Sequence, residues 1–500
     1  MTTPTAAPEV GTTAGRVRGI WREGSAAFLG IPFAEAPTGE RRFAAPVPHA
    51  AWEGVLDATA YGATPQCAAL SEITLIPEPS IPGDSTLNVN VFTPAPDSDS
   101  ALPVLVYIHG GGFVAGSPAS PWYDGAAFAR DGVVTVSVSY RLGFDGFGWI
   151  EDAPQNRGVL DWLLALEWVR DNIGAFGGDP ARVTIAGQSA GGGAVLSLLA
   201  VPRAAALFQR VISISGATSD LPVADAEVFG RRLAELAGVQ PTRAGLSALD
   251  EATILALQAQ VASPAPAPGD EDDEDDALAG LVQLAAGGLV WGPVVDGDLL
   301  PQAVADALRS GVGAEKELVL GATDNEFNMA LTAHRDALAA VPAAAVLTRF
   351  GLADDAAAAY AAAHDGRDTA DILGQYITDR MFRTTALTIA RARAATGAPT
   401  WLYRFSWPSP TMGGACHCLD VPFFFDCLGA ERVQNIAGVN PPQALADDVH
   451  GAAVAFIVGG DPGWTPFDAA TEAGRLFDLP SRTDEHAYAD VEVLLPQAVR

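Results

Sequence analysis

The amino-acid sequence predicts an α/β protein in which a central, mostly parallel, twisted β-sheet is flanked by helices. Six short runs rich in β-branched residues alternate along the chain with longer stretches of helical character. Most of these runs are continuously apolar, which is typical of strands buried on both faces of a parallel sheet. Because parallel strands need crossover connections, the alternation favours three layers.

The expected strands occupy residues 102–109, 133–139, 182–187, 210–215, 317–321 and 400–405. The expected helices occupy residues 158–173, 191–200, 224–237 and 370–395. The segment before about residue 95 is expected to form hairpins and loops, with residues 87–92 as an antiparallel edge strand. The sequence therefore predicts an antiparallel N-terminal region joined to a parallel sheet.

The whole chain, residues 1–500, is expected to form one domain. An Ala-rich stretch lies at 333–365, and the region of about 330–400 is predicted to form a helical lid or side region. Residues 263–276 read SPAPAPGDEDDEDD. Because like charges repel, this segment is predicted to be a mobile surface loop.

Composition limits the classes of partner. Hydrophobic residues make up 49% of the chain, enough for a large core, and the net charge of −31 disfavours nucleic acid and anionic membranes. No apolar run is long enough to predict a membrane-spanning helix. The N-terminus lacks the basic and apolar parts of a secretory signal, and four cysteines do not form a disulfide framework. We therefore expect a cytoplasmic protein.

A G-x-S-x-G element spans residues 187–191. It follows the expected strand at 182–187 and opens the expected helix at 191–200. In this strand–turn–helix setting a serine hydroxyl is exposed at the edge of a sheet and can act as a nucleophile. Ser189 is therefore the predicted nucleophile, with a helix cap as the structural alternative.

Three consecutive glycines follow the strand at 102–109, in the segment HGGGF. Attack of a serine on a carbonyl needs donors for the developing negative charge, and glycines allow backbone N–H groups to point into a site. The predicted donors are the N–H groups of Gly111, Gly112 and Ala190. We expect a structural role for His109.

The serine also needs a base. In proteins with this serine turn the chain order is Ser, then Asp or Glu, then His, so the base should come after the serine and the acid. Five of the seven histidines lie after Ser189. His417, in a Gly-rich loop after the strand at 400–405, is the favoured base, and His450 is its rival. The flanking Cys416 and Cys418 do not predict a metal site, because neighbouring ligands bind one ion poorly and no partner pair has zinc-site spacing. No cofactor is expected.

The acid that orients the base should follow a strand between the serine and the histidine. The strand at 317–321 is followed by Asp324 and Glu326. Their spacing alone does not choose between them.

These motifs together resemble those of type-B carboxylesterases, the family that includes cholinesterases and bacterial para-nitrobenzyl esterases. The resemblance runs from about residue 10 to the C-terminus and includes residues 28–34 and 156–194. It implies the α/β-hydrolase fold. It also aligns Glu326 with the family's acid, in a G-x-x-x-x-E element, and His417 with its histidine, in a G-A-x-H-x-x-D/E element.

Three departures from the family pattern affect the expectations. Gln188 stands where the family usually has Glu, so a charge near the site is lost. Phe327 stands where the family usually has Gly, and this bulkier neighbour is expected to narrow the pocket. Thr86 replaces a cysteine of the family's second signature, so Cys67 is expected to be a free thiol.

The resemblance implies ester hydrolysis through an acyl-enzyme formed on Ser189, with His417 as the base and Glu326 as the orienting acid. An amidase or peptidase, or an esterase acting on lactones, carbamates or large natural-product esters, would use the same three residues. A non-catalytic, cholinesterase-like binding protein would have lost them.

The expected partner is a small-molecule ester bound in an apolar pocket, and the expected assembly is a monomer or homodimer. Aromatic residues are the candidates for the pocket lining: Phe113, Trp122, Trp291, Phe327 and Phe424.

Overall fold

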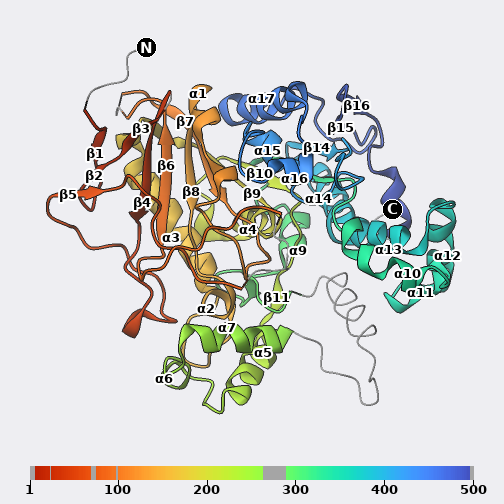
Figure 1. The fold of residues 1–500 in the computed structure, drawn as a ribbon, viewed down its shortest axis with the longest axis horizontal. Helices are drawn as coiled ribbons and strands as arrows, with labels where there is room; N and C mark the ends of the chain where they lie inside the picture. The colour runs from red at the N-terminus through yellow and green to blue at the C-terminus, as the bar shows by residue number, and fades with distance from the viewer. Residues whose placement is uncertain (1–5, 23, 69–74, 97–98, 263–288, 496–500) are drawn as a thin grey trace.

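The computed structural model describes residues 6–22, 24–68, 75–96, 99–262 and 289–495, and the predicted acidic loop at 263–276 lies outside them. A large β-sheet runs through the molecule with helices on both sides (Figure 1). Within the described residues this sheet has 11 strands. Their spatial order is β16 (Arg482–Asp484), β15 (Gly474–Phe477), β14 (Thr400–Phe405), β13 (Glu317–Thr323), β10 (Arg210–Ile214), β9 (Gly178–Gln188), β7 (Leu102–Ile108), β8 (Val134–Val138), β6 (Asn88–Thr93), β4 (Ser25–Pro32) and β3 (Ile20–Arg22).

The pairing confirms the predicted mixed architecture. The strands from β15 to β8 run parallel to one another, and antiparallel pairs complete both edges of the sheet. All six predicted central strands are present. The expected antiparallel strand forms β6, but the prediction that it lies at an edge is wrong, because β6 pairs with both β8 and β4. Two smaller sheets lie outside the main one: β1 (Glu9–Gly11), β2 (Arg16–Arg18) and β5 (Val55–Asp57) form the first, and β11 (Leu221–Pro222) and β12 (Val294–Val295) form the second.

Both faces of the sheet are buried, as the continuous apolar runs predicted. Along β7, Val104 and Val106 face one core cluster, whereas Leu105 and Tyr107 face another. Helices α3 (Arg157–Asn172) and α4 (Ala190–Ala200) belong to the first cluster, and α17 (Gln443–Gly459) belongs to the second. The parallel strands are therefore enclosed on both faces of the sheet. The polar sequence motifs follow the C-terminal ends of these strands.

The predicted helical region forms a group with its own core, containing Leu347, Tyr360, Leu373 and Ile377. Its helices are α10 (Arg335–Leu338), α11 (Ala343–Arg349), α12 (Asp354–Ala363) and α13 (Thr369–Thr378). Helix α14 (Thr384–Ala395), at the end of the predicted region, packs in the first main core cluster instead. The predicted helix at 370–395 is interrupted by a π-helical turn, Asp379–Arg383. Whether this region acts as a lid stays a prediction. The remaining helices are α1 (Ala126–Arg130), α2 (Gly143–Phe147), α5 (Val223–Leu236), α6 (Arg243–Leu246), α7 (Glu251–Ala262), α9 (Val304–Arg309), α15 (Val421–Phe424) and α16 (Val433–Ala437).

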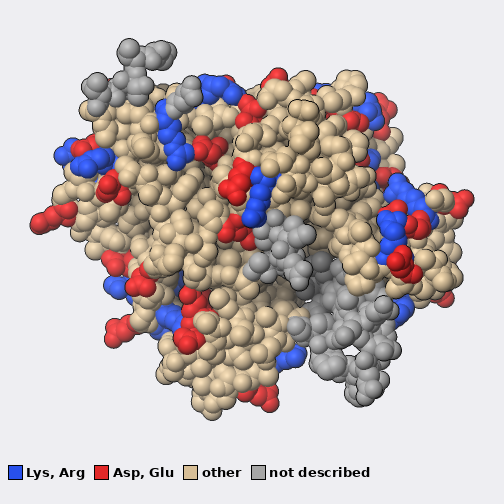
Figure 2. Space-filling view, in the orientation of Figure 1, with Lys and Arg blue, Asp and Glu red and all other residues tan. Residues whose placement is uncertain are grey.

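Acidic and basic side chains are interspersed on the face of the molecule seen in Figure 2. Many charged side chains of the described residues are paired: Arg22 bonds with Asp124, and Arg335 bonds with Asp371 at 2.6 Å. On that face, the excess negative charge is therefore not gathered into one patch. Among the helices of the described residues, none has the length and apolar character that a membrane crossing requires.

Candidate active site

Ser189 lies in a strained turn between β9 and α4. Its backbone has φ 57° and ψ −123°, a conformation that side-chain-bearing residues rarely adopt. The glycines on either side make the turn possible, because a Cβ on Gly187 would lie 2.3 Å from Gly191 O, and one on Gly191 would lie 2.1 Å from Ile108 O. The turn leaves Ser189 half-exposed between buried neighbours.

The predicted oxyanion loop follows β7 and lies beside the serine. A Cβ on Gly110 would be 3.1 Å from the Cβ of Ser189. Gly111 and Gly112 have φ values of 110° and 60°, which favour glycine. Within the described part of the chain, the N–H groups of Gly111, Gly112 and Ala190 donate to no protein acceptor. They are therefore free to bind an oxygen of a ligand.

Glu326 and His417 meet through a short hydrogen bond between the Glu326 carboxylate and His417 Nδ1. Glu326 follows β13 and is fully buried. Its second carboxylate oxygen accepts from the N–H of Thr323 at 2.8 Å, and its carbonyl accepts from the N–H of His417 at 3.1 Å. The carboxylate is thus fixed at both oxygens, and the proton of the neutral imidazole is held on Nδ1.

The other imidazole nitrogen faces Gln188, the residue directly before Ser189. The two Nε2 atoms are 3.1 Å apart. With Nδ1 protonated, His417 Nε2 is an acceptor, and the Gln188 amide is its donor. The Ser189 hydroxyl makes no hydrogen bond with the described residues. The expected Ser189–His417 hydrogen bond therefore stays a prediction, although the imidazole lies at the serine turn.

Comparisons with known proteins decide the family. A sequence profile described as the carboxylesterase family matches residues 6–477. The chain belongs to the carboxylesterase family.

Similar proteins cover nearly the whole chain. The para-nitrobenzyl esterase of Bacillus subtilis (strain 168) is 32% identical over 506 aligned positions, which cover 97% of this chain and 95% of that protein. The phenmedipham hydrolase of Pseudarthrobacter oxydans is 33% identical over 484 positions, which cover 91% and 90%. The solved structure of the Geobacillus stearothermophilus carboxylesterase EST55 matches with a TM-score of 0.82 at 32% identity, covering 97% of this chain and 98% of that one. The protein is therefore a serine carboxylesterase with the α/β-hydrolase fold.

The carboxylesterase buries its candidate base beside two carboxyl groups. Burial opposes the charged imidazole, but the Cys418 sulfur and the Glu326 carboxylate outweigh burial and raise the pKa of His417 well above its ordinary value. Burial, followed by the charge of Glu326, raises the pKa of Asp420 to about 7. Near neutral pH, Asp420 is therefore partly protonated and contributes only part of a negative charge beside the imidazole.

The alternative residues for the acid and the base have other partners in the carboxylesterase. The Asp324 carboxylate accepts two hydrogen bonds from Arg404, at 2.8 and 3.0 Å. The rival histidine, His450, lies at 3.0 Å from Asp131 and packs on Phe128. The structure thus places Glu326, not Asp324, against His417.

His109 is buried beneath the predicted oxyanion loop. Its ring stacks on Tyr140, and its Nδ1 lies 2.8 Å from Gly110 O. Burial lowers the pKa of His109 to about 4. The imidazole is therefore neutral at ordinary pH and supports the loop as a packed ring.

One of the five predicted pocket residues touches His417, the candidate base. Phe327 stacks on His417 with 5.1 Å between ring centroids and 27° between ring planes. The other four are at most 4% exposed and lie in the main core clusters: Phe113, Trp122, Trp291 and Phe424. Their assignment to a pocket stays a prediction.

Sequence reasoning missed Phe382. It lies in the π-helical turn, 5.7 Å from the Phe327 ring and 5.3 Å from the His417 ring. No motif or spacing indicates this contact, because it forms between distant segments. The four cysteines, all within the described chain, are unpaired. Cys67 is a free thiol, as the family resemblance implied.

Proposed function

We propose that Ser189, His417 and Glu326 form the catalytic triad of this carboxylesterase, with Gly111, Gly112 and Ala190 N–H groups as the oxyanion hole. The observation that carries the proposal is the hydrogen bond from His417 to the buried Glu326, next to a serine in a strained, half-exposed turn. These are the roles that nucleophilic acyl transfer requires.

The reaction proceeds in two halves. Ser189 attacks the ester carbonyl while His417 Nε2 takes its proton, and the oxyanion is bound by the backbone N–H groups. The protonated His417 then donates to the departing alcohol, which leaves an acyl-enzyme. Water repeats the sequence on the acyl group. In the structure the Gln188 amide is hydrogen-bonded to His417 Nε2. This amide must therefore move aside when the serine proton is transferred to Nε2.

The triad is tested with Ser189→Ala and the matched control Ser197→Ala, which lies in α4, the helix that follows Ser189, and loses a hydrogen bond to Gly193 O. We expect Ser189→Ala to lose about 10⁴-fold or more in kcat for p-nitrophenyl butyrate. We expect Ser197→Ala to retain activity, and labelling by a fluorophosphonate probe to disappear only in Ser189→Ala. Similar rates for Ser189→Ala and wild type would refute the triad.

The substrate we propose is a neutral carboxylic ester of a small molecule. Gln188 brings no charge to the imidazole, and Phe327 and Phe382 form an apolar wall beside it. Relatives are named for para-nitrobenzyl and phenmedipham substrates, and the same triad would also serve amides, lactones or carbamates. Turnover of an ester and its matched anilide distinguishes an esterase from an amidase.

The cellular setting is part of the proposal. The unpaired cysteines fit a reducing compartment, and the relatives described above are bacterial. We infer a bacterial cytoplasmic enzyme, acting as a monomer or homodimer.

A further inference from the structure

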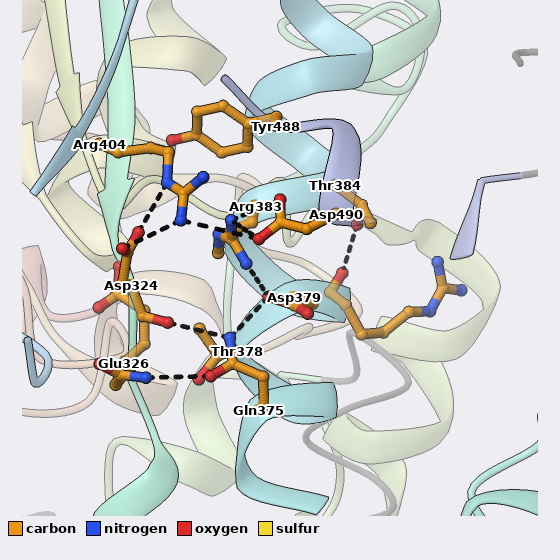
Figure 3. A network of polar contacts seen from close by, with 12 residues as sticks. Asp324, Glu326, Gln375, Thr378, Asp379, Arg383, Thr384, Arg404, Tyr488 and Asp490 are labelled. Carbon is orange, nitrogen blue, oxygen red and sulfur yellow. Dashed lines mark hydrogen bonds and ion pairs between the residues drawn. The ribbon is translucent and has the colours of Figure 1, made fainter. Parts of the chain in front are cut away.

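A buried polar network joins the helical side region to the loop that carries Glu326 (Figure 3). We call residues 324–328 the acid loop. The side chains of the network on α13 and the π-helical turn are at most 4% exposed: Gln375, Thr378, Asp379 and Arg383. Because buried polar groups are costly unless they are hydrogen-bonded, such a network fixes the segments that it joins.

Gln375 is the side chain through which α13 holds the acid loop. Its amide nitrogen donates to the carbonyl oxygen of Asp324 and to Asp379 Oδ1, both at 2.9 Å. Its oxygen accepts from Asn325 Nδ2 at 3.0 Å. With both donors and the acceptor engaged, the Gln375 amide has one orientation that satisfies loop and helix together.

Asn325 connects Gln375 to the segment that carries His417. Its side-chain oxygen accepts from the N–H of Ala415 at 3.0 Å, and its own N–H donates to Ala415 O at 2.9 Å. Glu326 and His417 are the next residues to pair along these two segments. A displacement of Asn325 would therefore change the geometry of the Glu326–His417 hydrogen bond.

The far end of the network is anchored by ionic contacts. Asp379 accepts from Arg383 at 2.6 Å and from the Tyr360 hydroxyl at 2.7 Å. Arg383 also bonds with Asp490 at 2.6 Å. The π-helical turn that carries Asp379 and Arg383 is a geometry often found at functional sites. Gln375 is thus joined, through Asp379, to an ion-pair network that also reaches the sheet, because Asp490 contacts Arg404 of β14 at 3.7 Å.

We propose that Gln375 is a positioning residue for ester hydrolysis. It holds Asn325, and through Asn325 it keeps the Glu326 carboxylate facing His417 Nδ1. This inference rests on the proposed triad. Because Gln375 does not touch the reacting atoms, it affects kcat and the proton affinity of His417 rather than substrate binding.

The test variant is Gln375→Met, which keeps the side-chain size and removes the hydrogen bonds. We expect kcat for p-nitrophenyl butyrate to fall by about 10- to 100-fold, because small misplacements of catalytic groups have effects of that size. KM should be nearly unchanged. The acid limb of kcat/KM should move to lower pH, because a loosened Glu326 stabilises the imidazolium less.

The matched control is Tyr376→Phe, the next residue on α13. Its hydroxyl donates to Phe350 O at 3.4 Å, within the core of the helical region. The control should lower the melting temperature without moving kcat or the acid limb. A purely structural role for Gln375 would give the same pattern in Gln375→Met, and that result would overturn the proposal.

A second variant, Asn325→Ala, removes the other partner of the hydrogen bond between Gln375 and Asn325. It should reproduce the shift of the acid limb, and the double variant should be no slower than the slower single variant. Additive losses, or a wild-type acid limb in Asn325→Ala, would overturn the proposal even if Gln375→Met fails to fold. Ser189→Ala is measured in the same assay. If Ser189→Ala keeps the wild-type activity, the triad itself is rejected. If activity is lost in Ser189→Ala but unchanged in Gln375→Met, only the positioning role of Gln375 is rejected.

Discussion

The contact between Gln188 and His417 predicts how the pH dependence of the carboxylesterase is set. The Gln188 amide donates to Nε2 of the neutral imidazole, which favours the form of His417 that acts as a base. Gln188→Glu, which restores the residue usual in the family, would place a carboxylate at this position. We expect the new charge to stabilise the imidazolium and to raise the pKa of His417 further.

The size of the shift follows from the geometry. At the 3.1 Å separation of the two nitrogens, an effective dielectric constant of about 20 gives an attraction of about 5 kcal/mol between carboxylate and imidazolium. That attraction corresponds to an upper limit of about 4 pKa units. Because Gln188 is only 1% exposed, desolvation of the carboxylate offsets most of it, and we expect a shift of about 1 to 2 units.

The assay is the pH profile of kcat/KM for an uncharged ester, whose acid limb reports the base in the free enzyme. Activity needs the neutral imidazole, so a higher pKa moves the acid limb to higher pH. Gln188→Met separates the charge from the loss of the amide: losing one hydrogen bond of about 1 kcal/mol moves the limb by less than about 1 unit. The acid limb is expected at the lowest pH in wild type, at a higher pH in Gln188→Met and at the highest pH in Gln188→Glu. A limb in Gln188→Glu that coincides with that of wild type, or lies below it, would refute the reasoning.

Two further predictions concern side chains next to the proposed triad. Phe327→Ala removes the ring stacked on His417, so kcat/KM for bulky acyl esters should rise relative to that for acetate esters; an unchanged acyl-chain profile would contradict a role in specificity. For His109, the pKa falls from 6.5 to about 4 on folding, so the unfolded state binds more protons between these values and stability is lost as the pH drops through them. Urea unfolding should therefore show a loss between pH 6.5 and 4 that is about 3 kcal/mol smaller in His109→Phe, and equal losses would argue against a neutral buried imidazole.

The fold could be predicted because its signals are local. Strands buried on both faces are apolar at every position, so β7 is visible in the sequence although its residues alternate between two cores. The serine turn is equally local. Gly187 and Gly191 lie where a Cβ would collide with backbone, and the sequence therefore carries the turn in its residue types.

The choice between Asp324 and Glu326 was not local. Strand register decides it: Ala322 pairs with Arg404 across β13 and β14, and Asp324, two residues further, reaches the same arginine at 2.8 Å. Glu326 is left to bond with His417. Register between strands is a property of the folded sheet, so spacing along the chain does not contain it.

The pocket was less predictable because aromatic residues serve cores and pockets alike. Trp122 and Phe424 are of the aromatic type expected to line a binding pocket, yet they are 0% and 4% exposed and pack in the core. Phe382 contacts His417 from a π-helical turn far along the chain. Residue type indicates that a side chain will be buried but not what it will be buried against.

The two ends of the proposed triad are held by different parts of the molecule. Ser189 keeps a conformation that costs on the order of 1–3 kcal/mol, and its N–H donates to Ile214 O at 2.9 Å, so the sheet itself supports the strain. The Glu326 end is held by the sheet through the N–H of Thr323 in β13, and also from outside the sheet, by Gln375 of the helical region acting on Asn325 of the acid loop. Substitutions that loosen the serine turn should therefore also destabilise the fold, whereas those that loosen the acid loop can reduce catalysis while the sheet stays intact. The proposal therefore gives the helical region a part in positioning the triad, in addition to its predicted role as a lid.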